Sequence, residues 1–172
     1  GGRKKNVGQL LVGLGLLFIG MNTMSETVAP LKDLPQLQEV FTAFSNPLLG
    51  VAVGALVTAL IQSSSASVGI LQALAVTGQV SYGAAIPIIM GQNIGTCVTA
   101  IISSVGANKN ARRTALLHLS FNVIGTSVWL SVFCLLRARL PLPLLDDPAS
   151  RLGIAVAHSV FNVLCTLLML PL

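Results

Sequence analysis

Three long, mostly apolar runs constrain this chain more than any other feature of its sequence. They cover residues 7–28, 114–136 and 152–172, and charged residues lie at or just outside their ends. About 20 apolar residues in a helix span the hydrocarbon core of a bilayer. We therefore expect each run to be a full transmembrane helix in an all-α, polytopic membrane protein that has the lipid bilayer as its main solvent.

The composition excludes most soluble classes of protein. Only 9% of the residues are charged, whereas ordinary soluble domains carry about 25%. The net charge of +5 is not gathered on a basic face with aromatic residues, so no nucleic-acid partner is expected. Cys97, Cys134 and Cys165 lie inside apolar stretches and are interpreted as buried free thiols.

Two further apolar stretches are interrupted by small and polar residues. Residues 48–76 are interrupted at 62–67, and residues 84–106 are interrupted at 91–96. The first apolar part, 48–61, makes only about 21 Å of helix, which is too short to cross a bilayer. We predict a re-entrant helical hairpin over the first stretch and one broken transmembrane helix over the second.

Charge along the chain predicts its orientation. Residues 29–47 contain three prolines and several charges, which favours a surface segment with one short amphipathic helix. Basic residues near span ends mark the cytoplasmic side. We expect a multi-pass protein of the cell (inner) membrane with both termini in the cytoplasm, on the side of Arg3, Lys4, Lys5, Lys109, Arg112 and Arg113.

The interruptions predict a binding site for a small anion. In lipid, irregular backbone survives only where protein covers it or where it lines a wet cavity. A helix that starts there offers free N–H groups and the positive end of its dipole, and serine hydroxyls add donors. Exposed carbonyl and amide oxygens suit an alkali cation. The alternative is structural, with the serines as interhelical hydrogen bonds and Gly91-xxx-Gly95 as a close packing face.

A second pattern, H-x-x-F-N, occurs twice, from His118 to Asn122 and from His158 to Asn162. At helical spacing His, Phe and Asn share one face. We interpret both copies as polar contacts that hold helices to the core, with a role in the permeation path as the alternative.

The chain carries no enzyme signature of the kinds G-x-S-x-G, P-loop or H-E-x-x-H, so we expect neither an enzyme nor a cofactor. An intramembrane serine hydrolase using Ser63–Ser65 remains a remote alternative, because no feature of the sequence brings a histidine to those serines.

The two interruptions together closely resemble the paired signature of the sodium/phosphate cotransporter family, type II and its bacterial relatives. The matching motifs are Gln62-Ser63-Ser64-Ser65-Ala66 and Gly91-Gln92-Asn93-Ile94-Gly95-Thr96. The resemblance extends over nearly the whole chain and is to the second of two inverted halves, each with one QSSS hairpin. It implies sodium-coupled symport of inorganic phosphate by alternating access, with sodium as the coupling ion.

The resemblance also implies which residues form the site. It assigns phosphate or sodium binding to Gln62, Ser63, Ser64, Ser65, Asn93 and Thr96, with sodium held by Gln62, Ser65, Asn93 and Thr96, and with Ser67, Gln92 and Thr58 as secondary candidates. Because QSSS occurs once, residues 1–172 are expected to be a single transmembrane repeat unit. The other half comes from a partner chain, from a second copy in a dimer, or from the rest of a longer protein of which this chain is a fragment. The alternative is a non-transporting helix-bundle subunit that packs against a partner.

Overall fold

The structure, a computed structural model, describes residues 2–30, 39, 44 and 46–171. Within these residues the chain is helical, and its β-type pairing is one isolated bridge between Ser81 and Pro148. The expected surface segment at 29–47 falls largely outside the described residues. The elements are α1 (Gly2–Val28), α3 (Pro47–Ile61), α4 (Ser64–Ala75), α5 (Tyr82–Ser104), α6 (Lys109–Arg139), a 3-10 turn (Pro143–Leu145) and α7 (Arg151–Met169).

Among the described residues, α1, α5, α6 and α7 are long and apolar enough to cross a membrane. The chain is therefore an all-α, polytopic membrane protein, as the apolar runs predicted. Helices α3 and α4 are shorter, and at 1.5 Å per residue α3 is only about 22 Å long. They form the two arms of a helical hairpin whose tip lies at Gln62 and Ser63.

Local sequence explains where most of these helices begin. A side-chain oxygen accepts a backbone N–H from the first turn of each of five helices, which satisfies a group that has no partner inside the helix. The capping residues are Asn46 for α3, Ser63 for α4, Ser81 for α5, Asn108 for α6 and Ser150 for α7.

In place of the expected break at residues 91–96, α5 is continuous from Tyr82 to Ser104. The glycines there serve close packing against α3. A Cβ atom on Gly91 would overlap the carbonyl oxygen of Val51, and one on Gly95 would overlap that of Ala55. Gly54 of α3 fits against α5 in the same way. The polar and small residues of 91–96 thus bring two helix backbones together and do not interrupt the helix.

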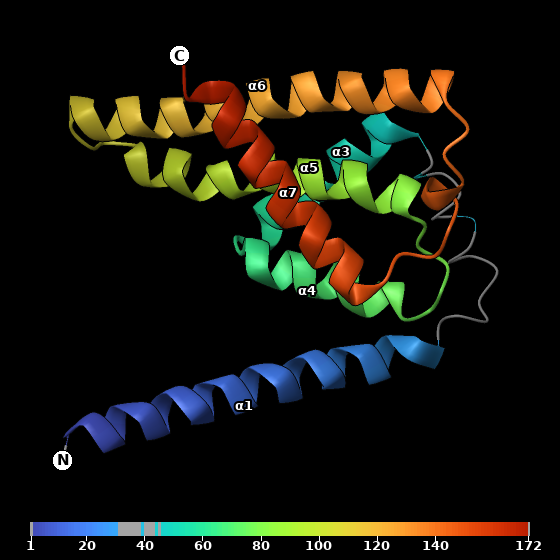
Figure 1. Cartoon of the computed structure of the whole chain (residues 1–172). Helices are drawn as coiled ribbons and strands as arrows, with labels where there is room; N and C mark the ends of the chain where they lie inside the picture. Colours follow the sequence, from blue (N-terminus) through green and yellow to red (C-terminus); the bar gives the residue numbers. More distant parts are fainter. Residues whose placement is uncertain (1, 31–38, 40–43, 45, 172) are drawn as a thin grey trace.

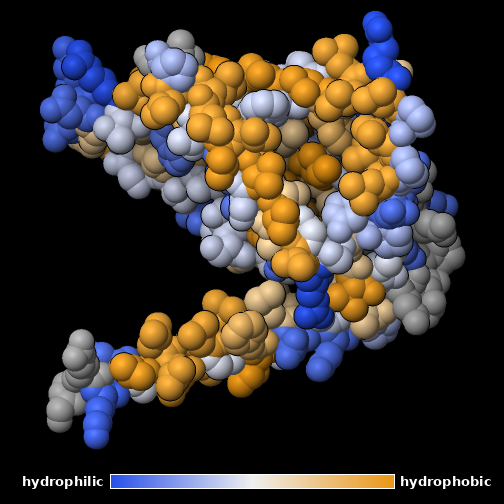
Figure 2. Space-filling model, in the orientation of Figure 1, coloured by the Kyte–Doolittle hydropathy of each residue, from blue (hydrophilic) through white to orange (hydrophobic). Residues whose placement is uncertain are grey.

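The helices enclose a hollow on one side of the molecule. Helix α5 contacts both α3 and α6. In Figure 1, α7 crosses in front of α5 obliquely, and much of α1 is separated from the other helices. Helix α1 contacts α4, the second arm of the hairpin. Figure 2 shows the wedge-shaped opening that separates much of α1 from the other helices.

The connections before α5 and before α7 are tied to each other. The backbone N–H of Ala149 donates to the Val80 carbonyl over 2.7 Å, and that of Tyr82 donates to the Asp147 carbonyl over 3.1 Å. The hydroxyl groups of Tyr82 and Ser150 also lie 3.2 Å apart. These bonds fix the start of α7 relative to α5 and to the hairpin.

Candidate functional site

The hairpin tip is an irregular piece of backbone inside the apolar part of the chain. Gln62 ends α3 in the left-handed conformation, with φ of 59°. Ser63 is extended and caps α4, its hydroxyl oxygen accepting from the N–H of Ala66 over 3.3 Å. The N–H groups of Ser64 and Ser65, in the first turn of α4, have no partner within the helix. The predicted break in the hairpin is therefore confirmed, and it spans two residues.

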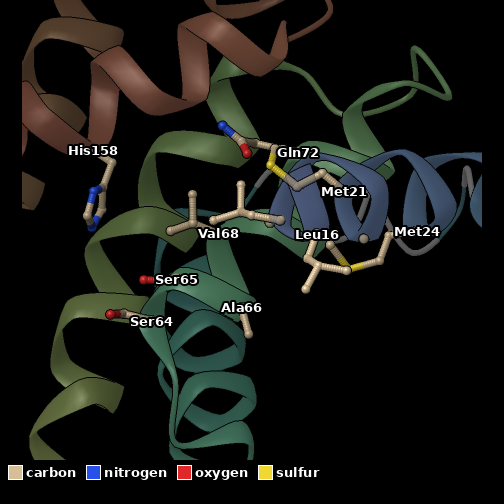
Figure 3. A pocket seen from close by; sticks show the side chains of 12 residues that line it. Leu16, Met21, Met24, Ser64, Ser65, Ala66, Val68, Gln72 and His158 are labelled. Atoms are coloured by element: carbon tan, nitrogen blue, oxygen red, sulfur yellow. The ribbon is translucent and has the colours of Figure 1, made fainter. Parts of the chain in front are cut away.

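A cavity of about 510 Å³ opens beside the first turn of α4, between α1, α4 and α7. Its polar lining consists of Ser64, Ser65, Gln72 and His158, and Leu16, Met21, Met24 and Val68 are among its apolar residues. In Figure 3 the imidazole of His158 extends from α7 toward the side on which the hydroxyls of Ser64 and Ser65 lie. No Lys, Arg, Asp or Glu is among the lining residues described. The cavity can therefore recognise an anion only through neutral donors and the dipole of α4.

Ser67, only one turn further along α4, has a different environment. Its hydroxyl oxygen accepts from the hydroxyl of Thr58 over 2.7 Å and from the amide nitrogen of Gln92 over 2.9 Å. All three side chains are buried. The polar stretch 62–67 thus divides into two parts: Ser64 and Ser65 line a cavity, and Ser67 joins both arms of the hairpin to α5.

The amide oxygen of Gln92 is buried without a hydrogen-bond partner among the described residues. Gln92 also lines a second, apolar cavity of about 240 Å³ together with Ser67 and Leu71. A buried polar atom without a partner costs about 1–3 kcal/mol. The burial of this oxygen near the hairpin therefore costs free energy.

Asn93 and Thr96 are not joined to the serines by side-chain hydrogen bonds. The amide nitrogen of Asn93 donates to the Ile89 carbonyl, and the hydroxyl of Thr96 donates to the Gln92 carbonyl, both over 2.9 Å. Their side-chain bonds therefore stay within α5. Of these candidates on α5, Gln92 is the one whose side chain has a hydrogen bond to α4 among the described residues.

The two H-x-x-F-N copies have different surroundings. On α6, the amide of Asn122 donates to the sulfur of Cys97 over 3.3 Å and so joins α6 to α5. On α7, His158 lines the cavity beside Ser65. Sequence reasoning favoured a structural role for both copies, with a role in the permeation path as the alternative, and assigned no role to Gln72. Within the part of the chain that the structure describes, no cluster of three or more His, Cys, Asp or Glu side chains could hold a metal ion.

Comparison with known proteins gives a consistent set of relatives. The family described as Na+/Pi-cotransporter matches residues 33–140. "Uncharacterized protein YqeW" of Bacillus subtilis is 33% identical over 98% of this chain and 54% of its own length. "Putative inorganic phosphate export protein YjbB" of Escherichia coli is 29% identical over 99% of this chain and 32% of its own length. "Sodium-dependent phosphate transport protein 2B" of Homo sapiens is 37% identical over 77% of this chain and 20% of its own length.

The chain thus spans about half the length of the first of these relatives and less of the other two. No solved structure matches it.

Proposed function

Because this chain belongs to the Na+/Pi-cotransporter family, we propose that it is one transmembrane repeat unit of a protein that carries inorganic phosphate with sodium across the cell membrane. The mechanism we propose is secondary active symport by alternating access, with the second half supplied by another repeat or a second copy. One relative is named for phosphate export and another for sodium-dependent phosphate transport. Either direction is open to a symporter, because the ion gradients set the direction of net flux.

The observation that carries this proposal is the opening of the α4 N-terminus, with Ser64 and Ser65, into the cavity beside α1 and α7. The first turn of a helix concentrates unpaired N–H groups and about half a positive charge. Two serine hydroxyls add donors that can rotate toward an oxyanion. Phosphate oxygens accept such hydrogen bonds, so this end of α4 suits phosphate without a Lys or Arg.

The lack of formal positive charge among the described lining residues supports sodium coupling. An anion of one or two negative charges is costly to hold away from water when only neutral donors surround it. A bound sodium ion supplies the compensating charge, and oxygen atoms are the ligands that such a hard cation prefers. We propose the side-chain oxygens of Gln62, Ser65, Asn93 and Thr96 as its ligands. Binding of both ions then favours the conformation that can switch between the two sides.

We also propose that both termini face the cytoplasm. In Figure 1 the start of α1 and the start of α6 lie at the same end of the molecule. Lys4, Lys5, Lys109, Arg112 and Arg113 belong to these two ends. Basic residues that flank spans are retained on the cytoplasmic side of membranes.

The test is uptake of labelled phosphate into proteoliposomes, with and without a sodium gradient. The protein is reconstituted alone and together with a second repeat half, and Ser65→Ala is compared with Ser127→Ala. Ser127 is a matched control because it lies exposed on α6 and bonds only the Val123 carbonyl of its own helix. We expect sodium-dependent flux in the wild type and in the control but not in Ser65→Ala. Absence of flux in every assembly would contradict the proposal.

One observation favours the second candidate, a non-transporting subunit whose polar residues hold helices together. The bonds of Ser67 to Thr58 and Gln92 fit such a role. Thermal unfolding separates the two candidates, because a ligand that binds only the folded state stabilises it by about 2.7 kcal/mol at 100 times its Kd. A rise in Tm with phosphate and sodium supports the transporter, and an unchanged Tm supports the structural subunit.

A further inference from the structure

Helices α4 and α7 face each other along the cavity in a fixed register. The amide nitrogen of Gln72 on α4 donates to the carbonyl of Arg151, the first residue of α7, over 3.0 Å. Ser65 precedes Gln72 by seven residues, and His158 follows Arg151 by seven. Seven residues are about two helical turns, so each pair lies on one face of its helix. With the helices running in opposite directions, Ser65 and His158 lie at the same level, and both line the cavity.

Asn162, one turn further along α7, contacts the imidazole of His158. The Asn162 amide nitrogen donates one hydrogen to the His158 carbonyl over 2.8 Å, which fixes the orientation of the amide. The same nitrogen lies 3.4 Å from Nε2 of the ring. An amide N–H can only donate, so a hydrogen bond across this contact requires Nε2 to accept and favours the tautomer that carries its proton on Nδ1. In that tautomer the imidazole has one N–H donor left for a ligand.

The other copy of the pattern shows that this arrangement is specific to α7. Asn122 also donates to the carbonyl of its own histidine, His118, over 3.0 Å. Its amide then contacts the sulfur of Cys97 on α5 and not the imidazole. His118 is not among the residues that line the cavity. The chain thus contains two histidines in the same sequence pattern, of which one faces the serines.

We propose that His158 is a further anion-binding residue of the candidate site, and that its Nδ1–H donates to a phosphate oxygen held at the first turn of α4. This inference rests on the proposed function and extends it to α7. The α4 N–H groups and serine hydroxyls reach the anion from one wall of the cavity, and His158 reaches it from the opposite wall. Asn162 acts through His158, because its contact with Nε2 favours the tautomer that carries the proton on Nδ1.

The test compares variants of the two histidines in phosphate binding, measured with labelled inorganic phosphate in sodium buffer on the protein in nanodiscs. His158→Leu keeps a side chain of similar size and removes the N–H donor. We expect its Kd for phosphate to rise about tenfold, as for loss of one hydrogen bond to a charged group. His158→Asn restores an amide donor near the position of Nδ1 and should recover part of the affinity. His118→Leu is the matched control and should bind as the wild type does.

Nitrogen NMR on histidine-labelled protein measures the chemical shifts of the ring nitrogens. A purely structural role of His158 would leave these shifts unchanged when phosphate is added. The sequence contains two histidines, so His118→Leu and His158→Leu assign the spectrum. We expect Nδ1 of His158 to be protonated without phosphate and to shift when phosphate is added, while His118 does not shift. One result would overturn this inference and leave the proposed function standing. In it, the wild type binds phosphate and Ser65→Ala does not, His158→Leu binds phosphate as the wild type does, and the nitrogen signals of His158 do not shift when phosphate is added. If the wild type binds no phosphate in any assembly, the proposed function is overturned and this inference with it.

Discussion

The amide nitrogen of Gln92 in α5 donates to the hydroxyl oxygen of Ser67 in α4 over 2.9 Å. The same oxygen accepts from Thr58 of α3, so one buried atom joins both arms of the hairpin to a membrane-spanning helix. The exposed fractions of Ser67, Gln92 and Thr58 are 1%, 2% and 0%. The hairpin is therefore anchored close to the tip that opens into the cavity, which limits how far the tip can move independently of α5.

Ser67→Ala should lower the free energy of unfolding by about 1 kcal/mol. Each interhelical hydrogen bond in a membrane is worth about 0.6 kcal/mol, and this change removes two of them. Reversible unfolding in detergent micelles measures the difference. Ser127→Ala is the control, because its hydroxyl bonds only its own helix. A Ser67→Ala variant as stable as the control would show that these bonds do not hold the hairpin.

Gly91→Ala should destabilise the protein by about 2–3 kcal/mol, because the added methyl group would overlap the carbonyl oxygen of Val51 and force α3 and α5 apart. Gly13→Ala in α1 is the control. Gly13 has no neighbouring atom within 4 Å of an added Cβ, so alanine there should be neutral or stabilising by up to about 1 kcal/mol. Thermal unfolding of the two variants gives the comparison. Equal Tm values would contradict the close approach of α3 and α5.

Gly91→Ala concerns a stretch in which sequence reasoning and structure differ. The spans were predictable because apolar length is a local property of the sequence, and the hairpin break was predictable because Gln62 and Ser63 follow an apolar run too short to cross. The stretch from Gly91 to Thr96 has similar residue types but forms a continuous helix. What distinguishes the two cases is the packing of α3 against α5. The spacing of Gly91 and Gly95 offered close packing as the alternative, but it did not identify α3 as the partner helix.

The residues that line the cavity were also only partly predictable from the sequence. The predicted serines Ser64 and Ser65 do line it, but Gln72 and His158 join them only because α4 and α7 meet in a particular register. Seven-residue spacing within each helix is visible in the sequence. Which two helices face each other is set by contacts between residues as far apart as Gln72 and Arg151, and no local motif encodes that pairing.

Gln62 offers a way to separate folding from binding. It adopts φ of 59°, a conformation that costs a residue with a Cβ atom about 1–2 kcal/mol and that glycine adopts freely. Gln62→Gly should therefore fold at least as stably as Gln62→Ala. If the Gln62 side chain binds an ion, both variants lose sodium-dependent phosphate binding. Unfolding experiments and binding of labelled phosphate to the same samples give the two readouts, and normal phosphate affinity in both variants would remove Gln62 from the site.

We expect water to fill the cavity beside α4. Ala66→Cys tests this, because Ala66 lines the cavity without belonging to the proposed ligand set. A membrane-impermeant methanethiosulfonate reagent needs a hydrated thiolate, so we expect it to modify a cysteine at position 66. Val12→Cys is the control, because Val12 is exposed on α1 within an apolar span and should face lipid. Native Cys97 and Cys165 are buried and should react little, whereas Cys134, which the sequence predicted to be buried, is exposed. Both variants are therefore made in a Cys134→Ser background. Phosphate with sodium should slow modification at position 66, whereas a rate as low as that of Val12→Cys would mean that lipid or protein fills the cavity.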